Sequence, residues 1–491
     1  MRCAPIGVLQ SVSNQLTRLP AHRLAQLVRA GELTPLELVD AHIRAAMRWN
    51  PVLNAVVANR FDDARAEARA MTEQLTRRNR ADLPPLFGVP FTVKESLGVR
   101  GLPHTAGSVL RRHVVAASSA PTVDRVIAAG GICLAVTNVP ELAMWLETDN
   151  RVFGRTSNPY DPARTSGGSS GGEAAIIGAG ASPFGLGTDA GGSIRVPSSF
   201  CGIFGHKPSG GLVPTTNHVP CPSPRAARFV AVGPLARSAR DLHPILSAIA
   251  GPDGVDPGCD DMALGDPAEV RVEHLTVHLL PDVEAFTIAP ALKAAVARAA
   301  AALQARGARV VEARLPELSQ AVAMWGDSLK VTAETSFEHW LGFGGKVGVR
   351  KELLKLALGR SSHTFPALAF LAIEKASSLV DVMKGGYQRA NALRVRLAAE
   401  LGTDGVILAP TFTVPAPLHG EMLRRAGDFA LPGIWNILET PATAVPVGLD
   451  GTGMPLGVQV IARPGNDAAT IACAIALEEA FGGWRPPELP G

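Results

Sequence analysis

The sequence lacks the features that mark membrane-spanning and nucleic-acid-binding proteins. No stretch reaches the roughly 18 consecutive apolar residues that a membrane-spanning helix requires. Only 19% of the 491 residues are charged, and the formal net charge of +3 is too small to indicate a nucleic-acid partner. The composition therefore predicts a globular protein with no transmembrane segment and no nucleic-acid partner.

Cysteine is also sparse, with six residues at irregular spacing and no CxxC pair. This pattern favours buried free thiols in a reducing compartment over a disulfide framework. The apolar run at residues 4–9 is short and contains Pro5, and no A-x-A cleavage pattern follows closely, so we expect no signal peptide. The expected location is the cytoplasm.

Patterns for metals and nucleotides are weak or incomplete. His274 and His278 lie in a stretch that alternates like a strand, and no HExxH motif occurs. The glycine-rich segment 167–172 lacks the Gly-Lys-Ser/Thr ending of a P-loop. The spacing of residues 185–190 resembles a dinucleotide fingerprint but does not open into a clear helix. We expect neither a metal ion nor an organic cofactor.

Apolar strand candidates alternate with helical segments along much of the chain. Thr34 to Glu37 form a capping box, which predicts a helix that runs to about Trp49 and ends at Asn50-Pro51. The strand candidates are residues 87–93, 132–136, 310–313, 406–409 and 458–462, and the further helix candidates are residues 61–80, 122–129 and 290–306. This alternation predicts an α/β fold around a largely parallel sheet, with ligand sites at strand ends.

The expected organisation is one domain over residues 1–491. Its motifs concentrate in about residues 85–215, and a Gly/Asp/Pro-rich stretch at about 252–267 is a candidate connector.

Two serines, 24 positions apart, provide the strongest functional signal. Ser169 lies in Gly167-Gly168-Ser169-Ser170-Gly171-Gly172, and Ser193 lies in the segment 188–195, which contains Gly191-Gly192. Upstream, Lys94 ends an apolar strand candidate. A nucleophilic serine needs a base and donors for a developing oxyanion, and a lysine acts as base when burial lowers its pKa. These segments supply hydroxyls, accessible amides and a candidate base.

Glycines leave the backbone open beside the second serine. Because Gly191 and Gly192 carry no side chain, the amides of Ala190, Gly191, Gly192 and Ser193 can converge on a carbonyl oxygen. We therefore predict an oxyanion hole there.

The first serine segment alone is open to other interpretations. Gly167-x-Ser169-x-Gly171 matches the nucleophile elbow of α/β-hydrolases, whose triad needs an Asp and then a His further along the chain. Asp404 and His419 are the candidates for those positions. The same segment could equally be a glycine-rich turn that packs a helix against a sheet.

Taken together, these segments resemble the amidase signature family over roughly residues 20–480. The matching motifs are Lys94, Thr137-Asn138, Asn158-Pro159, Gly167–Gly172, Gly187–Pro197, Gly205–Pro208, Pro441-Ala442 and Gly457–Gln459. Within that family, Asn138–Trp145 and Ser362–Pro366 are most similar to fatty-acid amide hydrolases of the second type. The resemblance implies a central twisted mixed β-sheet flanked on both sides by α-helices.

The resemblance also implies roles for individual residues. Ser193 would be the nucleophile, Lys94 the base, and Ser169, on a cis peptide, the bridging serine. A structural pair of Asp189 and Arg195 would hold the turn, although the sequence alone also allows an ordinary surface ion pair. Ser170 would hydrogen-bond in the same cluster.

The expected function is therefore hydrolysis of a small-molecule carboxylic acid amide to an acid and an amine or ammonia, through an acyl-enzyme on Ser193. Two alternatives stay open. One is the amidase-like component of a tRNA-dependent amidotransferase complex, and the other is a Ser-His-Asp esterase or lipase. A homodimer is also left open.

The segment 346–373 mixes basic and large apolar residues. On a helical wheel Val349, Leu353 and Leu356 share one face, with Lys351 and Lys355 opposite. The segment could be a helical pair that covers the core, or an apolar lip over the acyl channel with weak contact to a membrane surface.

Overall fold

The computed structural model describes residues 15–75, 77, 79–377 and 383–488. Within them, one central sheet contains eleven strands. The strands are β1 Val56–Asn59, β2 Pro90–Lys94, β3 Ile132–Thr137, β6 Phe184–Asp189, β7 Phe204–Lys207, β8 Ala231–Ala236, β9 Thr276–Leu279, β10 Arg309–Glu312, β11 Gly405–Pro410, β12 Ala442–Leu449 and β13 Pro455–Ala462. A separate two-stranded ribbon pairs β4 Asp149–Asn150 with β5 Gly154–Arg155.

The sheet is mixed. Its spatial order is β1-β3-β2-β6-β8-β7-β12-β13-β11-β9-β10. Strands β3, β2 and β6 are parallel, as are β11, β9 and β10, whereas the pairs that involve β1, β7, β8, β12 and β13 are antiparallel. The expectation of a largely parallel sheet, drawn from the strand–helix alternation, is therefore wrong. The mixed sheet implied by the family resemblance is confirmed. The other expectation failed because apolar runs do not encode strand direction.

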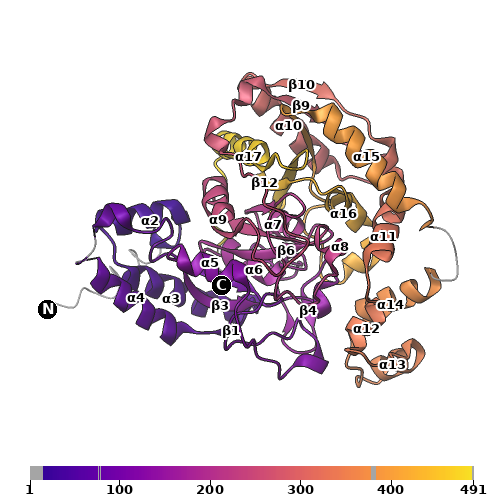
Figure 1. Cartoon of the computed structure of the whole chain (residues 1–491), viewed down its shortest axis with the longest axis horizontal. Helices are drawn as coiled ribbons and strands as arrows, with labels where there is room; N and C mark the ends of the chain where they lie inside the picture. Colours follow the sequence, from indigo (N-terminus) through magenta and orange to yellow (C-terminus); the bar gives the residue numbers. More distant parts are fainter. Residues whose placement is uncertain (1–14, 76, 78, 378–382, 489–491) are drawn as a thin grey trace.

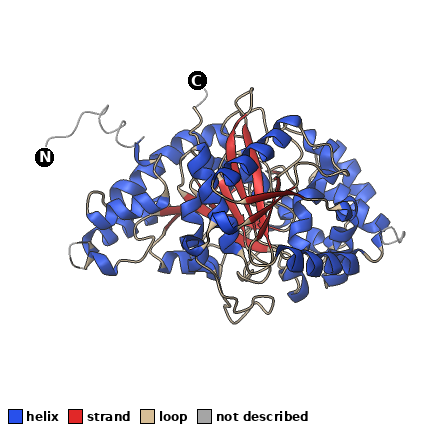
Figure 2. Ribbon diagram, turned by 90° about the horizontal axis from the view of Figure 1, so that it is seen from above, coloured by secondary structure: helices blue, strands red, loops and turns tan. Residues whose placement is uncertain are grey.

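Helices lie on both sides of this sheet, and the strands run at different angles between them (Figure 2). The helices are α2 Ala21–Ala30, α3 Pro35–Leu53, α4 Phe61–Gln74, α5 Pro121–Ala128, α6 Gly171–Gly178, α7 Arg195–Phe200, α8 Pro224–Ala227, α9 Leu242–Ile249, α10 Pro290–Ala305, α11 Ala321–Thr332, α12 Phe337–Gly342, α13 Val349–Ala357, α14 Phe365–Ser377, α15 Gly386–Leu401, α16 Ala430–Ile437 and α17 Asp467–Phe481. This arrangement confirms the predicted α/β class.

Parallel pairing in the centre of the sheet gathers the functional strand ends. Every residue of β2, β3 and β6 is buried, as expected for continuous apolar runs covered on both faces. Because β2 runs parallel to β3 and β6, Lys94, Thr137 and Asp189 all finish at the same edge of the sheet. The fully buried helix α6 begins at that edge.

The predicted first helix has the expected capping box but a different end. Thr34 and Glu37 bond reciprocally, and α3 then continues through Pro51 to Leu53. The predicted stop at Asn50-Pro51 is wrong because Pro51 lies in the last turn, and left-handed Asn54 ends the helix instead.

Two further predicted features have a clear outcome in the fold. Residues 61–80 do not form one helix, since α4 ends at Gln74 and a short 3₁₀ helix follows at Arg80–Asp82. The candidate connector 252–267 contains no α-helix or strand, a 3₁₀ helix begins at its last residue, and its role as a domain boundary stays a prediction.

Helices α12 to α14 form a lobe at the lower right of Figure 1. The lobe has its own small apolar core, to which Phe337, Leu341, Leu368 and Leu371 contribute. Leu142, from the segment after β3, joins this core and ties the lobe to the sheet. The segment 346–373 thus forms a helical pair, α13 and α14, on the rim of the molecule.

The described residues bear on two features considered in the sequence, membrane-spanning helices and paired cysteines. No helix there combines the length and apolarity required to cross a bilayer. The described cysteines are all free, and they are Cys133, Cys201, Cys221, Cys259 and Cys473. Cys3 lies outside the described residues.

Candidate active site

Lys94, at the end of β2, is the centre of the site. Its side chain is completely buried, and Nζ lies 2.6 Å from Ser169 Oγ. Nζ also lies 2.8 Å from Thr188 Oγ1 and 3.3 Å from the Thr188 carbonyl oxygen, at the end of β6. The strand end and the serine loop thus bring together two of the three catalytic residues predicted from the sequence.

Burial changes the charge state of this lysine. Removal from water lowers the pKa of Lys94 to about 7, although the negative charges of Asp189 and Glu173 oppose the change. A lysine with this pKa is partly neutral near pH 7 and can accept a proton. The environment thus supplies what the sequence predicted for a lysine base.

Glu173 is a member of the site that sequence reasoning missed. It lies in the first turn of the buried helix α6 and accepts hydrogen bonds from the hydroxyls of Thr92 and Thr137, the latter at 2.7 Å. Burial raises the pKa of Glu173 to about 8. The charged form of Glu173 raises the pKa of Lys94, so burial of this carboxyl weakens the countercharge available to the lysine. The sequence signal that could have indicated Glu173 is its position directly after Gly171-Gly172 of the serine motif.

The loop between β5 and α6 carries the first serine. The peptide bond between Gly168 and Ser169 is cis, as the family resemblance implied. Among the described residues the Ser193 hydroxyl has no hydrogen-bond partner. The two serine segments are joined through Ser170, whose amide donates to the Ser193 carbonyl at 3.2 Å and whose hydroxyl donates to the Thr188 carbonyl at 3.2 Å. Ser193 is 7% exposed.

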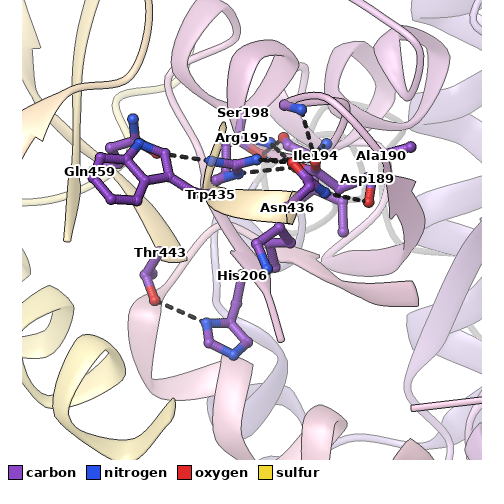
Figure 3. A network of polar contacts seen from close by, with 12 residues as sticks. Asp189, Ala190, Ile194, Arg195, Ser198, His206, Trp435, Asn436, Thr443 and Gln459 are labelled. Atoms are coloured by element: carbon purple, nitrogen blue, oxygen red, sulfur yellow. Dashed lines mark hydrogen bonds and ion pairs between the residues drawn. The ribbon is translucent and has the colours of Figure 1, made fainter. Parts of the chain in front are cut away.

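A buried ion pair holds the turn that carries Ser193. Arg195 Nε and Nη2 each lie 3.0 Å from a different oxygen of Asp189, and both side chains have no exposed surface (Figure 3). The alternative of an ordinary surface pair is therefore wrong. Burial opposes ionisation of Asp189, but the charge and hydrogen bonds of Arg195 outweigh it and hold the pKa of that carboxyl well below its usual range.

Two further amide side chains complete this network; Gln459 lies in a matched motif, but neither residue was expected at the site. Arg195 donates to Asn436 Oδ1 at 2.7 Å and to Gln459 Oε1 at 3.0 Å (Figure 3). Asn436 in turn donates to the Asp189 carbonyl at 2.7 Å. Neither residue was predicted to belong to the site, because both come from elements some 240 or more positions away. Each guanidinium nitrogen of Arg195 thus has a partner.

The carboxylate of Asp189 also fixes the backbone of the turn. It accepts the amides of Gly192 at 2.7 Å and Ile194 at 3.0 Å. Gly192 has a φ of +104°, and a Cβ there would lie 2.7 Å from the ring of Pro432, so only glycine fits. The amides of Ala190, Gly191 and Ser193 have no acceptor among the described residues.

Aromatic side chains border the same turn. The indole N–H of Trp325 donates to the Ala190 carbonyl at 3.0 Å. Its ring meets Phe429 and Phe370 edge-on, with centroid separations of 4.7 Å and 6.5 Å. A side chain at Gly191 would come within 4 Å of Trp325 and Phe429. Aromatic rings therefore lie against the turn at Ala190 and Gly191.

The esterase candidates do not meet Ser169. His419 contacts the Pro162 carbonyl, and the carbonyl of Asp404 accepts the Thr276 amide at the start of β9. The described residues contain no group of three or more His, Cys, Asp or Glu side chains arranged to hold a metal ion.

The fold and this network are those of an α/β enzyme in which a buried lysine contacts a serine hydroxyl. The sequence profile of the Amidase family matches residues 37–471. The chain belongs to the amidase family.

Individual relatives match over nearly the whole chain. It is 38% identical to fatty-acid amide hydrolase 2-A of Danio rerio, over 98% of this chain and 92% of the relative. It is 32% identical to a glutamyl-tRNA(Gln) amidotransferase component of Synechococcus sp. (strain CC9605), over 93% of this chain and 95% of the relative. The structure of 6-aminohexanoate cyclic dimer hydrolase aligns with a TM-score of 0.79 at 26% identity, over 96% of this chain and 99% of that one.

Proposed function

We propose that this amidase hydrolyses carboxylic acid amides through an acyl-enzyme on Ser193, with Lys94 as the base and Ser169 between them. The observation that carries the proposal is the 2.6 Å contact between the buried Lys94 Nζ and Ser169 Oγ, beside the turn of Ser193. This contact gives the lysine a hydroxyl neighbour to deprotonate. The lowered pKa of Lys94 supports the same role.

Protons move to Lys94 and back again during acylation. Ser193 Oγ attacks the carbonyl carbon while its proton passes to Ser169 Oγ, and the proton of Ser169 passes to Lys94 Nζ. When the C–N bond breaks, the proton returns by the same route to the leaving nitrogen. Water then attacks the acyl ester, releases the acid and restores Ser193. Each hydroxyl gives one proton and takes one, so charge and atoms balance.

The oxyanion that forms needs donors. Of the four amides predicted for this role, that of Gly192 donates to Asp189. The proposed oxyanion hole therefore relies on Ala190, Gly191 and Ser193, with Gly192 shaping the turn. One such donor lowers the activation barrier by about 3 kcal/mol.

The acyl group in this proposal is apolar. Trp325 and Phe429 border the turn, Phe370 packs against Trp325, and the relative that is 38% identical is named a fatty-acid amide hydrolase. Helix α14 contributes Phe370, and the segment of α13 presents the exposed Leu354 and Leu358 beside Lys351 and Lys355. These features support the lip interpretation of residues 346–373, with weak membrane-surface contact as its extension.

One alternative function retains a specific observation. The 32% identity to the amidotransferase component extends over 93% of this chain, so glutamine is a candidate amide substrate. A partner-dependent glutaminase would turn over glutamine only when its partner proteins are added, whereas the proposed enzyme acts alone.

The proposed location is the cytoplasm, supported by free thiols that are buried at all described positions except Cys221.

The test is a turnover screen of the isolated protein over short aliphatic, aryl and long-chain amides and glutamine, followed by acid quench and mass spectrometry. The expected result is hydrolysis of apolar amides, with the acyl mass added to the peptide that contains Ser193. An acyl adduct on Ser169, or turnover of glutamine alone, would contradict the proposal.

A further inference from the structure

The hydroxyl of Thr188 lies between two nitrogen atoms. Thr188 Oγ1 is 2.8 Å from Lys94 Nζ and 3.2 Å from His218 Nε2. The other ring nitrogen of His218, Nδ1, lies 2.7 Å from the Pro220 carbonyl oxygen. His218 is buried. Sequence reasoning gave neither Thr188 nor His218 a role.

The donors and acceptors in this series of hydrogen bonds, from Lys94 through Thr188 and His218 to Pro220, allow only one direction of donation. A carbonyl oxygen can only accept, so Nδ1 of His218 carries a proton. The ring is neutral, because burial and the charge of Lys94 lower the pKa of His218 to about 3. Nε2 therefore accepts a hydrogen bond from the Thr188 hydroxyl. That hydroxyl oxygen can then only accept from Lys94.

This direction fixes the orientation of the lysine. A neutral amine has two N–H bonds and one lone pair. Thr188 Oγ1 and the Thr188 carbonyl oxygen both accept from Lys94, at 2.8 Å and 3.3 Å. They use both N–H bonds, so the lone pair faces the remaining neighbour, Ser169 Oγ, at 2.6 Å.

We infer that His218 and Thr188 are positioning residues, which direct the lone pair of Lys94 at Ser169 by imposing one direction on the hydrogen bonds around it. This inference rests on the proposed function, since it concerns the same base.

Backbone contacts hold His218 in place. The amide of its neighbour Val219 donates to the Ser96 carbonyl at 2.8 Å, and His218 bridges Leu97, three residues after Lys94. The base and the positioning histidine thus belong to adjoining backbone.

The other ionisable groups that face this chain do not replace its contacts. The charges of Asp189 and Glu173 act on Lys94, and the charge of His104 acts on His218. The ring of His104 contacts the Ser96 carbonyl oxygen, and the His104 carbonyl accepts from Arg111, so neither contact involves Thr188 or His218.

Removal of the imidazole should misdirect the hydroxyl. In His218→Phe the Thr188 proton has no acceptor on that side and turns to the lone pair of Lys94, in competition with Ser169. We expect kcat to fall at least tenfold and KM to change less than twofold. The acid limb of the kcat/KM profile should move about half a pH unit lower, because the hydroxyl now stabilises the neutral amine.

The double variant His218→Phe/Thr188→Val separates positioning from packing. It lacks the misdirected hydroxyl, so it should recover several-fold activity over His218→Phe alone. His218→Gln, whose side-chain oxygen can accept the Thr188 proton, should keep most of the wild-type rate. His104→Phe is the matched control, since a second loss at Thr188 should only add to it.

Several results would overturn the inference. They are losses that simply add in the double variant, a His218→Gln variant as slow as His218→Phe, or an unmoved acid limb. Melting temperatures restrict the comparison to folded variants, and His218→Leu, which also lacks an acceptor, replaces His218→Phe if the latter unfolds. Ser193→Ala and Lys94→Ala serve as separate controls. If these two stay active the proposed function itself fails, whereas if they are inactive and the losses add, only the positioning role fails.

Discussion

At the residue scale, the behaviour of the site depends on the environment of Lys94. The side chain is an ordinary lysine that burial makes partly neutral near pH 7. Burial also raises the pKa of Glu173 to about 8, which weakens the countercharge that would reverse this effect. The identity of Lys94 could be predicted from its strand end, but the buried neighbours Glu173, Thr188 and His218 could not. Their contacts arise from the pairing of β2 with β6 and from a loop that returns near residue 218.

The pKa of Lys94 predicts the pH dependence of activity. Below about pH 7 the folded enzyme holds the lysine proton and has no base, and above it the proton is lost. The kcat/KM for an amide should therefore rise about tenfold per pH unit up to about pH 7 and then level off. A flat profile from pH 5 to 9, or an inflection near that of a free lysine, would contradict this assignment.

Replacement of the base provides a check by leaving group. Lys94→Ala should reduce kcat/KM for an amide more than for the matched ester, because an amine must receive a proton as it leaves and an alkoxide needs one less. Equal losses on the two substrates would mean that Lys94 does not deliver the proton.

At the element scale, the turn between β6 and α7 is held from outside its own sequence. The glycines and the pair Asp189 and Arg195 were visible in the sequence. The contacts of Asn436 from α16 and of Gln459 from β13 were not, although Gln459 lies in a matched motif, because only the mixed sheet brings these elements against α7. Strand direction likewise could not be predicted, since apolar runs look alike in parallel and antiparallel neighbours.

Loss of one member of this buried pair should destabilise the protein strongly. Asp189→Asn leaves the Arg195 charge buried without its partner, and the free energy of unfolding should fall by about 3–5 kcal/mol. Chemical denaturation measures the change. Glu400→Gln is the control, because it removes an exposed 3.0 Å contact with Arg396 and should cost less than about 1 kcal/mol. Similar losses for both variants would show that the buried pair has no special role.

Helix α14 offers a matched pair of positions for testing the acyl site. Phe370 contacts Trp325 at the turn, whereas Ile373 on the same helix is 58% exposed. Phe370→Ala should raise KM for long-chain amides about tenfold, equivalent to about 1.4 kcal/mol, and spare short ones. Ile373→Ala should change neither. A uniform rise across chain lengths would leave Phe370 with a packing role only.

At the scale of the whole molecule, the sheet brings together segments that the sequence keeps apart. Most predicted strands lie within a few residues of their observed positions, and the family resemblance matched the observed fold. The errors are the helix that continues past Pro51, the single helix predicted over residues 61–80, and the antiparallel strands. The first and the last reflect tertiary packing that local patterns do not record. The candidate site could be predicted where a motif is continuous and not where a distant segment completes it.

In the proposed reaction Ser193 carries the acyl group and Ser169 transfers its proton. The most direct measurement is covalent labelling by a fluorophosphonate probe, with mass spectrometry of the modified peptide. Wild-type protein should be labelled at Ser193, Ser193→Ala should show no labelling, and Ser169→Ala should still be labelled at Ser193, more slowly. Labelling of Ser193→Ala at Ser169, or its loss only in Ser169→Ala, would contradict the account.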